Sequence, residues 1–192
     1  MTLPNLRITI LGLNYAPEPT GIAPYTTRLA EMLASEGHNV NVLTGYPHYP
    51  EWKLRDGYTG WQRVESINGV MVKRLRHFVP NTLSNMHRMH LEISFGVRLL
   101  FARWHRPDVV LIVSPSLFAS AIVLLRSKFG LGKPKTGIWV QDIYSRGLEE
   151  TGTGNSMQTK AMKRFEGFVF RSATKVTVIH DRFKKYLVNA FS

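Results

Sequence analysis

The chain has 192 residues, enough for one domain with a hydrophobic core, and its 44% hydrophobic content excludes a disordered protein. Its 25 basic and 13 acidic residues give a net charge of +12, which predicts an anionic partner such as nucleic acid, a membrane surface or a phosphorylated small molecule. Cysteine is absent, which excludes disulfide bonds, a thiolate zinc site and a cysteine nucleophile.

The beginning of the chain is typical of a strand–helix–strand unit, with no signal peptide ahead of it. An apolar run over residues 8–13 predicts a buried parallel strand, and residues 40–44 predict a second one. Between them, a loop over residues 14–24 leads into apolar residues at helical spacing, and Gly37 is placed to end that helix. We therefore expect a right-handed crossover unit here.

A hairpin and a long helix are expected next. Residues 61–65 and 70–74 alternate in the manner of exposed strands, and Asn68-Gly69 between them favours a hairpin turn. Helical spacing continues over residues 84–104, and Pro107 ends that helix.

The rest of the chain alternates strands with helices. Strands are expected at residues 109–113, 136–140 and 175–179, and helices at residues 117–129, at 156–172 and from Asp181 onward. The uncharged stretch at residues 109–125 is shorter than the ~20 residues that a membrane span needs. The alternation predicts a single α/β domain over residues 1–192, with a Rossmann-like, doubly wound and mainly parallel sheet.

Open parallel sheets bind ligands at the carboxyl ends of their strands. In this sequence the rule selects residues 14–23, 45–53, 114–116 and 141–146, together with His180-Asp181. The first loop leads into a helix amino terminus at Gly21, where free amides suit a phosphate or a sugar hydroxyl; the alternative is that Gly21 only makes a tight turn. Neither a dinucleotide GxGxxG motif nor a P-loop GxxxxGK(S/T) motif is present.

Polar residues also follow two of the later strands. Asp142 is a candidate general base or sugar-binding carboxylate, although an aspartate at that position also caps helices. His180 repeats the arrangement on the next strand, and Asp181 beside it is expected to cap the last helix. His87 and His90 lie three apart on one helix without a matching carboxylate, so no metal site is expected.

The long expected helix is apolar on two faces. The face expected to pack on the core contains Met86, Met89, Ile93, Val97, Leu100 and Trp104. The opposite face, expected to point outward, combines Leu91, Phe95 and Leu99 with Arg88, Arg98 and Arg103. Residues 71–106 carry seven basic residues and one acidic residue. Outward apolar side chains among arginines predict contact with an anionic membrane surface; the alternative is burial of both faces, for example against a second domain.

Several runs of the sequence together resemble the retaining GT-B glycosyltransferases of family 4. These runs are residues 14–23, 29–33, 37–40, 43–50 and 139–144. The last two are similar to the colanic-acid and exopolysaccharide type within that family. The resemblance covers essentially the whole chain, and it implies the N-terminal, acceptor-side half of a GT-B fold.

The resemblance also implies an activity: transfer of a sugar from a nucleotide diphosphate to a lipid-linked or oligosaccharide acceptor, in bacteria, without a metal or other cofactor. It implicates Thr20, Gly21, Ile22, Tyr46, His48, Ser114 and Gln141 in binding substrate and donor phosphates, and Asp142 and His180 in catalysis. The donor site of the family lies in a second domain, so we expect no turnover by this chain alone.

The expected location is cytoplasmic, peripheral at the inner face of the cytoplasmic membrane, with no nucleic-acid partner. One alternative is a basic module that binds nucleic acid or a membrane without enzymatic activity; the net charge favours it, but no recognised nucleic-acid motif appears. A nicotinamide-dependent oxidoreductase is the other, and the missing GxGxxG motif argues against it.

Overall fold

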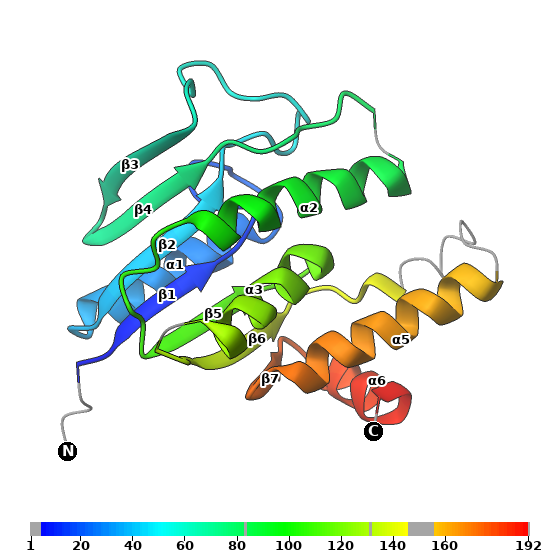
Figure 1. Ribbon diagram of the computed structural model, residues 1–192. Helices are drawn as coiled ribbons and strands as arrows, with labels where there is room; N and C mark the ends of the chain where they lie inside the picture. The colour runs from blue at the N-terminus through cyan, green and yellow to red at the C-terminus, as the bar shows by residue number, and fades with distance from the viewer. Residues whose placement is uncertain (1–4, 83, 131, 146–155, 192) are drawn as a thin grey trace.

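The computed structural model describes residues 5–82, 84–130, 132–145 and 156–191, and Figure 1 shows them as one sheet with helices on both faces. The strands are β1 (Arg7–Leu11), β2 (Asn39–Gly45), β3 (Gln62–Ile67), β4 (Val70–Leu75), β5 (Val109–Val113), β6 (Lys135–Val140) and β7 (Lys175–Val178). The helices are α1 (Ala23–Ser35), α2 (Asn85–Phe101), α3 (Leu117–Phe129), α5 (Ser156–Ser172) and α6 (Asp181–Phe191). The predicted elements are confirmed; the main difference is that α2 ends at Phe101, because Ala102 is extended.

The sheet confirms the predicted fold class. In the described residues, the strands follow the order β3-β4-β2-β1-β5-β6-β7. Every neighbouring pair is parallel except β3 and β4, which form the expected antiparallel hairpin. The expectation of two exposed strands is correct for β3 only. Val70 and Val72 of β4 are fully buried, because β4 also pairs with β2 and lies inside the sheet.

Two helical layers cover the sheet. The strand order runs outward from β1 in both directions, so right-handed crossovers place helices on opposite faces. α1 packs on one face, where Ala30 joins a cluster with Ile10 and Val42. α2, α3 and α5 cover the other face, where Phe95 and Val123 belong to the larger cluster (Figure 1).

The structure reverses the expected orientation of α2. Leu91, Phe95 and Leu99, predicted to contact a membrane, are 3%, 1% and 1% exposed and lie in the core. The reason is the contact between α2 and α3. A Cβ at Gly96, on the same face of α2, would stand 2.7 Å from Ile122 Cδ1 and 3.0 Å from Ala119 Cα, so only this face admits α3 closely.

The outer side of α2 is the face that we expected to find inside. Met86, Ile93, Val97 and Leu100 are exposed, while Trp104, beyond the helix end, is buried as predicted. The three arginines of the predicted contact also separate. Arg88 lines a cavity, Arg98 donates to the Trp61 carbonyl and lies over its ring, and only Arg103 is both exposed and outside the cavity. No helix in the described part of the chain has the length and apolar character to cross a membrane.

Candidate functional site

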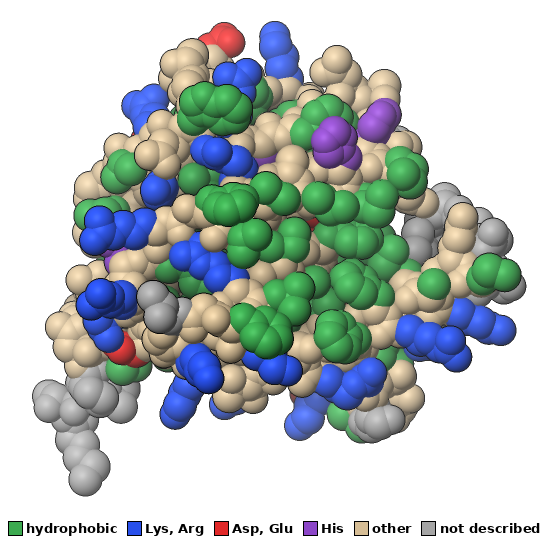
Figure 2. Space-filling view, viewed as in Figure 1, with side chains coloured by type: hydrophobic (Ala, Val, Ile, Leu, Met, Phe, Trp, Pro, Cys, Tyr) green, Lys and Arg blue, Asp and Glu red, His purple; other side chains and the backbone are tan. Residues whose placement is uncertain are grey.

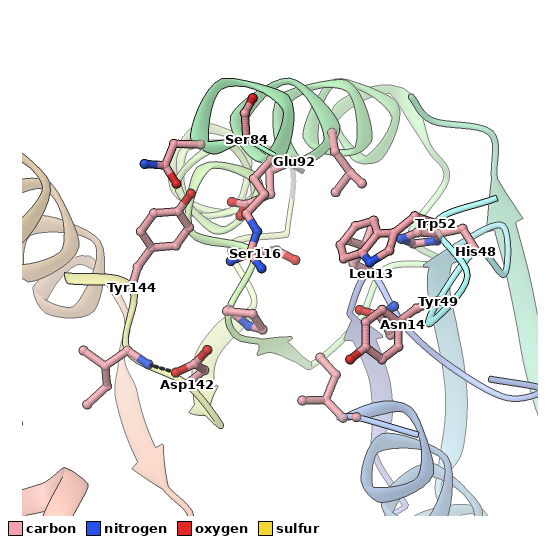
Figure 3. A pocket seen from close by; sticks show the side chains of 17 residues that line it. Leu13, Asn14, His48, Tyr49, Trp52, Ser84, Glu92, Ser116, Asp142 and Tyr144 are labelled. Carbon is pink, nitrogen blue, oxygen red and sulfur yellow. Dashed lines mark hydrogen bonds between the residues drawn. The ribbon is translucent and has the colours of Figure 1, made fainter. Parts of the chain in front are cut away.

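One cavity of about 490 Å³ lies at the carboxyl edge of the sheet, where the sequence placed the ligand site. The loops that follow β1, β2, β5 and β6 all contribute to it, as expected from the strand-end rule. Figure 3 shows Tyr144 and Asp142 on one side and Asn14, Tyr49 and Trp52 on the other. The amino-terminal part of α2 supplies a further wall, which the sequence did not predict.

Four of the predicted site residues line this cavity, and the others do not. Gly21, Ile22, His48 and Asp142 are part of its lining. Thr20, Tyr46, Ser114, Gln141 and His180 are not. The four loops therefore do share a cavity, and the roles predicted for the individual residues stay predictions.

Local hydrogen bonds explain some of the residues outside the cavity. The Tyr46 hydroxyl is turned to the Thr59 carbonyl, to which it donates at 2.7 Å. Ser114 Oγ donates to the Asp142 carbonyl at 2.8 Å, so it positions the loop after β6 without facing the cavity. His180 Nδ1 accepts from the Arg182 amide at 3.0 Å, which makes it a capping residue at the start of α6.

The first wall is built around the amino terminus of α1. Gly21 has a φ of +65°, a conformation that favours glycine, and a Cβ there would stand 3.2 Å from the Tyr49 ring. Ile22, at the N-cap, makes no side-chain capping bond, and the first turn of α1 has no acidic residue. The helix amides are therefore not neutralised by the protein, which suits an anionic ligand at this end of α1.

Glu18 holds the first two loops together, a role that the sequence analysis did not predict. Its side chain is buried; Oε1 accepts from the amides of His48 at 2.8 Å and Tyr49 at 2.9 Å. Its second oxygen, Oε2, accepts from Asn14 Nδ2 at 2.9 Å. The only local signal is an acidic residue between Pro17 and Pro19. The carboxylate thus positions both cavity loops at once.

His48 and His77 form a buried pair behind the second loop. Their rings lie 4.9 Å apart, and each Nδ1 donates to a backbone carbonyl, of Tyr46 and Leu75 respectively. Burial, helped by the neighbouring His48, lowers the pKa of His77 to about 3, so His77 is neutral at physiological pH. The two rings support the cavity wall from behind the second loop.

Glu92 of α2 is the second buried carboxyl that the sequence did not identify. It lines the cavity, and its Oε2 accepts from the Phe118 amide at 2.9 Å, at the amino terminus of α3. Burial raises its pKa to about 8, against the opposing effects of the Phe118 amide and Arg88. Glu92 occupies the amino terminus of α3, whereas the first turn of α1 carries no acidic residue.

The Glu92→Gln substitution is expected to remove a loss of stability that develops as pH rises towards 8. The folded chain keeps the Glu92 proton up to about pH 8, whereas the unfolded chain releases it near 4.5, so the free energy of unfolding falls as pH rises between these values. The slope reaches about 1.4 kcal/mol per pH unit at most. Urea unfolding at pH 6.5 to 8 measures this fall, which glutamine should abolish.

His77 sets the lower limit of that pH window. Below its ordinary pKa of 6.5, the unfolded chain binds a proton that the folded chain does not, so stability falls with falling pH and opposes the Glu92 effect. Above 6.5 the His77 effect no longer opposes the Glu92 effect. Identical pH dependence in the wild type and in Glu92→Gln would show that Glu92 is ionised in the folded chain.

The opposite wall is held by another buried carboxylate. Glu166 of α5 accepts from the amides of Tyr144 at 2.7 Å and Ser145 at 3.2 Å, which secures the loop after β6. Burial raises the pKa of Tyr144 to about 12, so its hydroxyl remains neutral. Asp142 is exposed, and its Oδ1 accepts from the Ile143 amide at 2.8 Å, as Figure 3 shows.

The cavity therefore offers groups suited to a phosphorylated sugar. The α1 amino terminus and Arg88 can meet negative charge, while Asp142 and Glu92 can hydrogen-bond hydroxyl groups. Tyr49 and Trp52, with ring centroids 5.6 Å apart, supply aromatic surface. A few polar groups converging on a partly apolar cavity are typical of small-molecule sites.

Comparison with known proteins gives a consistent result. A family model described as "Glycosyl transferase 4-like domain" matches residues 20–192. The chain is also 34% identical over 162 residues to the "Putative colanic acid biosynthesis glycosyl transferase WcaI" of Escherichia coli (strain K12). That alignment covers 79% of this chain, and the chain spans about 39% of the length of the relative.

The parallel sheet, the cavity at its carboxyl edge and the family match agree with the resemblance noted in the sequence. The match covers far more than half of the chain, from the cavity loop at residue 20 to the last residue. The chain belongs to the glycosyl transferase 4-like family, and its doubly wound sheet is the N-terminal half of a GT-B fold.

Proposed function

We propose that this chain is the acceptor-side half of a retaining glycosyltransferase that uses a nucleotide diphosphate sugar to build an exopolysaccharide or another cell-surface glycan. The observation that carries the proposal is the cavity shared by four strand-end loops and α2, with the amino terminus of α1 on its border. Membership of the family supplies the reaction class.

The cavity residues divide into two groups in this proposal. The amides at Gly21 and Ile22 approach the donor phosphates, because that helix end attracts negative charge. Asp142 accepts a hydrogen bond from an acceptor hydroxyl and is the candidate catalytic residue; Arg88 and Glu92 border the same space. The leaving diphosphate is neutralised by protein groups, without a metal or cofactor.

The proposal includes a second, donor-binding domain, in cis or in trans, because the relative is much longer than this chain. It also includes a lipid-linked or oligosaccharide acceptor and a peripheral position at the inner face of the cytoplasmic membrane. Nucleic acid has no part in it.

A transfer assay tests the proposal. The chain together with its donor-binding domain, given nucleotide diphosphate hexoses with a labelled sugar and a membrane extract, is expected to move the label into glycan with the anomeric configuration of the donor retained. The 192-residue chain alone is expected to move none, since the groups of the donor-binding domain that stabilise the leaving diphosphate are missing. Transfer by the chain alone contradicts the two-domain part, and inverted product contradicts the retaining mechanism.

A further inference from the structure

The outer surface of α2 and α3 carries a contiguous set of exposed apolar side chains, here named the α2–α3 apolar face. It consists of Ile93, Val97, Leu100 and Phe101 of α2 with Leu125 and Phe129 of α3. Phe101 is 82% exposed and Phe129 is 78% exposed. Figure 2 shows hydrophobic side chains gathered on this side of the molecule, with Lys and Arg around them.

The two helices form one surface at this place. Gly96 of α2 lies against Ala119 and Ile122 of α3, and Arg126 of α3 donates to the carbonyls of Leu99 and Ala102 at the end of α2. The face is therefore continuous across both helices. Single exposed apolar residues are normal on a protein surface, but a group of them on adjacent helices indicates a binding surface.

The charge around the face indicates an anionic partner. Residues 80–135 contain eight basic residues, Arg88, Arg98, Arg103, Arg106, Arg126, Lys128, Lys133 and Lys135, and two acidic ones, Glu92 and Asp108. Glu92 is buried, and Asp108 is paired with Arg7 at 2.6 Å. Arg103, Arg106 and Lys128 are exposed near the ends of the two helices. Exposed basic residues beside an apolar face, with no exposed unpaired acidic residue in this stretch, are complementary to anionic lipid.

We propose that the α2–α3 apolar face docks on an anionic lipid bilayer, with its apolar side chains entering the interface and the basic residues meeting lipid phosphates. This proposal rests on the membrane location in the proposed function, and it names the protein surface that makes the contact. It also explains how the cavity receives a lipid-linked acceptor. The first turns of α2 line the cavity at Asn85 and Arg88, so a bilayer along the outer side of α2 reaches the cavity rim.

Vesicle sedimentation tests this surface without any transfer assay. The chain is expected to sediment with vesicles of phosphatidylcholine containing about 30% phosphatidylglycerol at ~0.15 M salt, and far less with phosphatidylcholine alone. Serine at both Phe101 and Phe129 should weaken partition about tenfold or more, because each ring loses its apolar burial. The matched control is serine at both Met32 and Val64, exposed apolar residues on α1 and β3, which should bind as the wild type does.

Every outcome decides the question. Equal loss in both double variants, or no binding to phosphatidylglycerol, overturns the proposal. If the Phe101/Phe129 variant binds vesicles as well as the wild type does, and salt alone releases it, the contact is purely electrostatic. That result also overturns the proposal. A dimer in sedimentation velocity that the Phe101/Phe129 variant disperses assigns the face to a second copy of the chain. Transferase activity on a soluble acceptor with no vesicle binding would sink this inference and leave the proposed function standing.

Discussion

Replacing Gly21 with valine is expected to lower transfer by the complete two-domain enzyme about 100-fold or more while the fold persists. Valine at a φ of +65° is strained, and its Cβ would press on the Tyr49 ring at 3.2 Å. Relief of that strain moves the amides at the start of α1, which the proposal places at the donor phosphates. The measurement is kcat/KM, with circular dichroism and thermal unfolding as checks on the fold.

The opposite end of α1 provides a matched control. Gly37 has a φ of +90°, and a Cβ there would meet nothing within 4 Å. The Gly37→Val substitution therefore costs similar backbone strain, about 1–3 kcal/mol, at a distance from the cavity. We expect similar losses of stability in the two variants but a loss of transfer only at Gly21. Full activity in Gly21→Val would remove the first loop from the site, and equal loss of activity in both would attribute it to stability.

The Glu18→Ala substitution is expected to lower the free energy of unfolding by about 3 kcal/mol or more. Alanine leaves the buried amides of His48 and Tyr49 and the Asn14 side chain without their acceptor. Because these groups belong to the two loops that form one side of the cavity, transfer should fall with stability. Urea unfolding gives the first quantity, and kcat/KM at a temperature where the variant remains folded gives the second.

Two further variants separate the role of Glu18 from its charge. Glutamine keeps an oxygen for the two amides, and its NH2 group can donate to Asn14 once that amide turns over, so Glu18→Gln should cost only about 1 kcal/mol. Glu31, which accepts a single exposed bond from Asn68 at 2.7 Å, is the control, and its alanine variant should change stability little. A Glu18→Ala protein as stable and active as the Glu31→Ala protein would contradict the positioning role.

The elements and topology of this chain follow closely from its sequence. Apolar runs of strand length, a glycine at the end of α1 and the Asn68-Gly69 turn are local signals, and each is read from a few adjacent residues. The place of the cavity also follows, because the carboxyl ends of parallel strands meet at one edge whatever the side chains. Gly21 and Asp142 were identified on that ground, and both line the cavity.

The residues that build the cavity walls depend on partners distant in the chain. Glu18 acts through amides 30 and 31 residues away, and Glu92 through an amide 26 residues away, so neither carries a local signal of its role. His180 is the opposite case. It follows a strand, as the pattern for a site residue requires, but its side chain bonds to the first turn of its own helix. A position directly after a strand identifies candidate site residues, and tertiary contacts decide which of these residues line the same cavity.

The sequence by itself determined the α/β class, the first crossover unit and the edge of the sheet where the cavity lies, because these depend on periodicity and chain direction. Only the tertiary structure decided which side of α2 is inside. That helix is apolar on both sides, so its periodicity is satisfied by either orientation, and the choice was made by the close approach of α3 at Gly96. The same contact buries Phe95 and leaves Val97 and Phe101 on the surface.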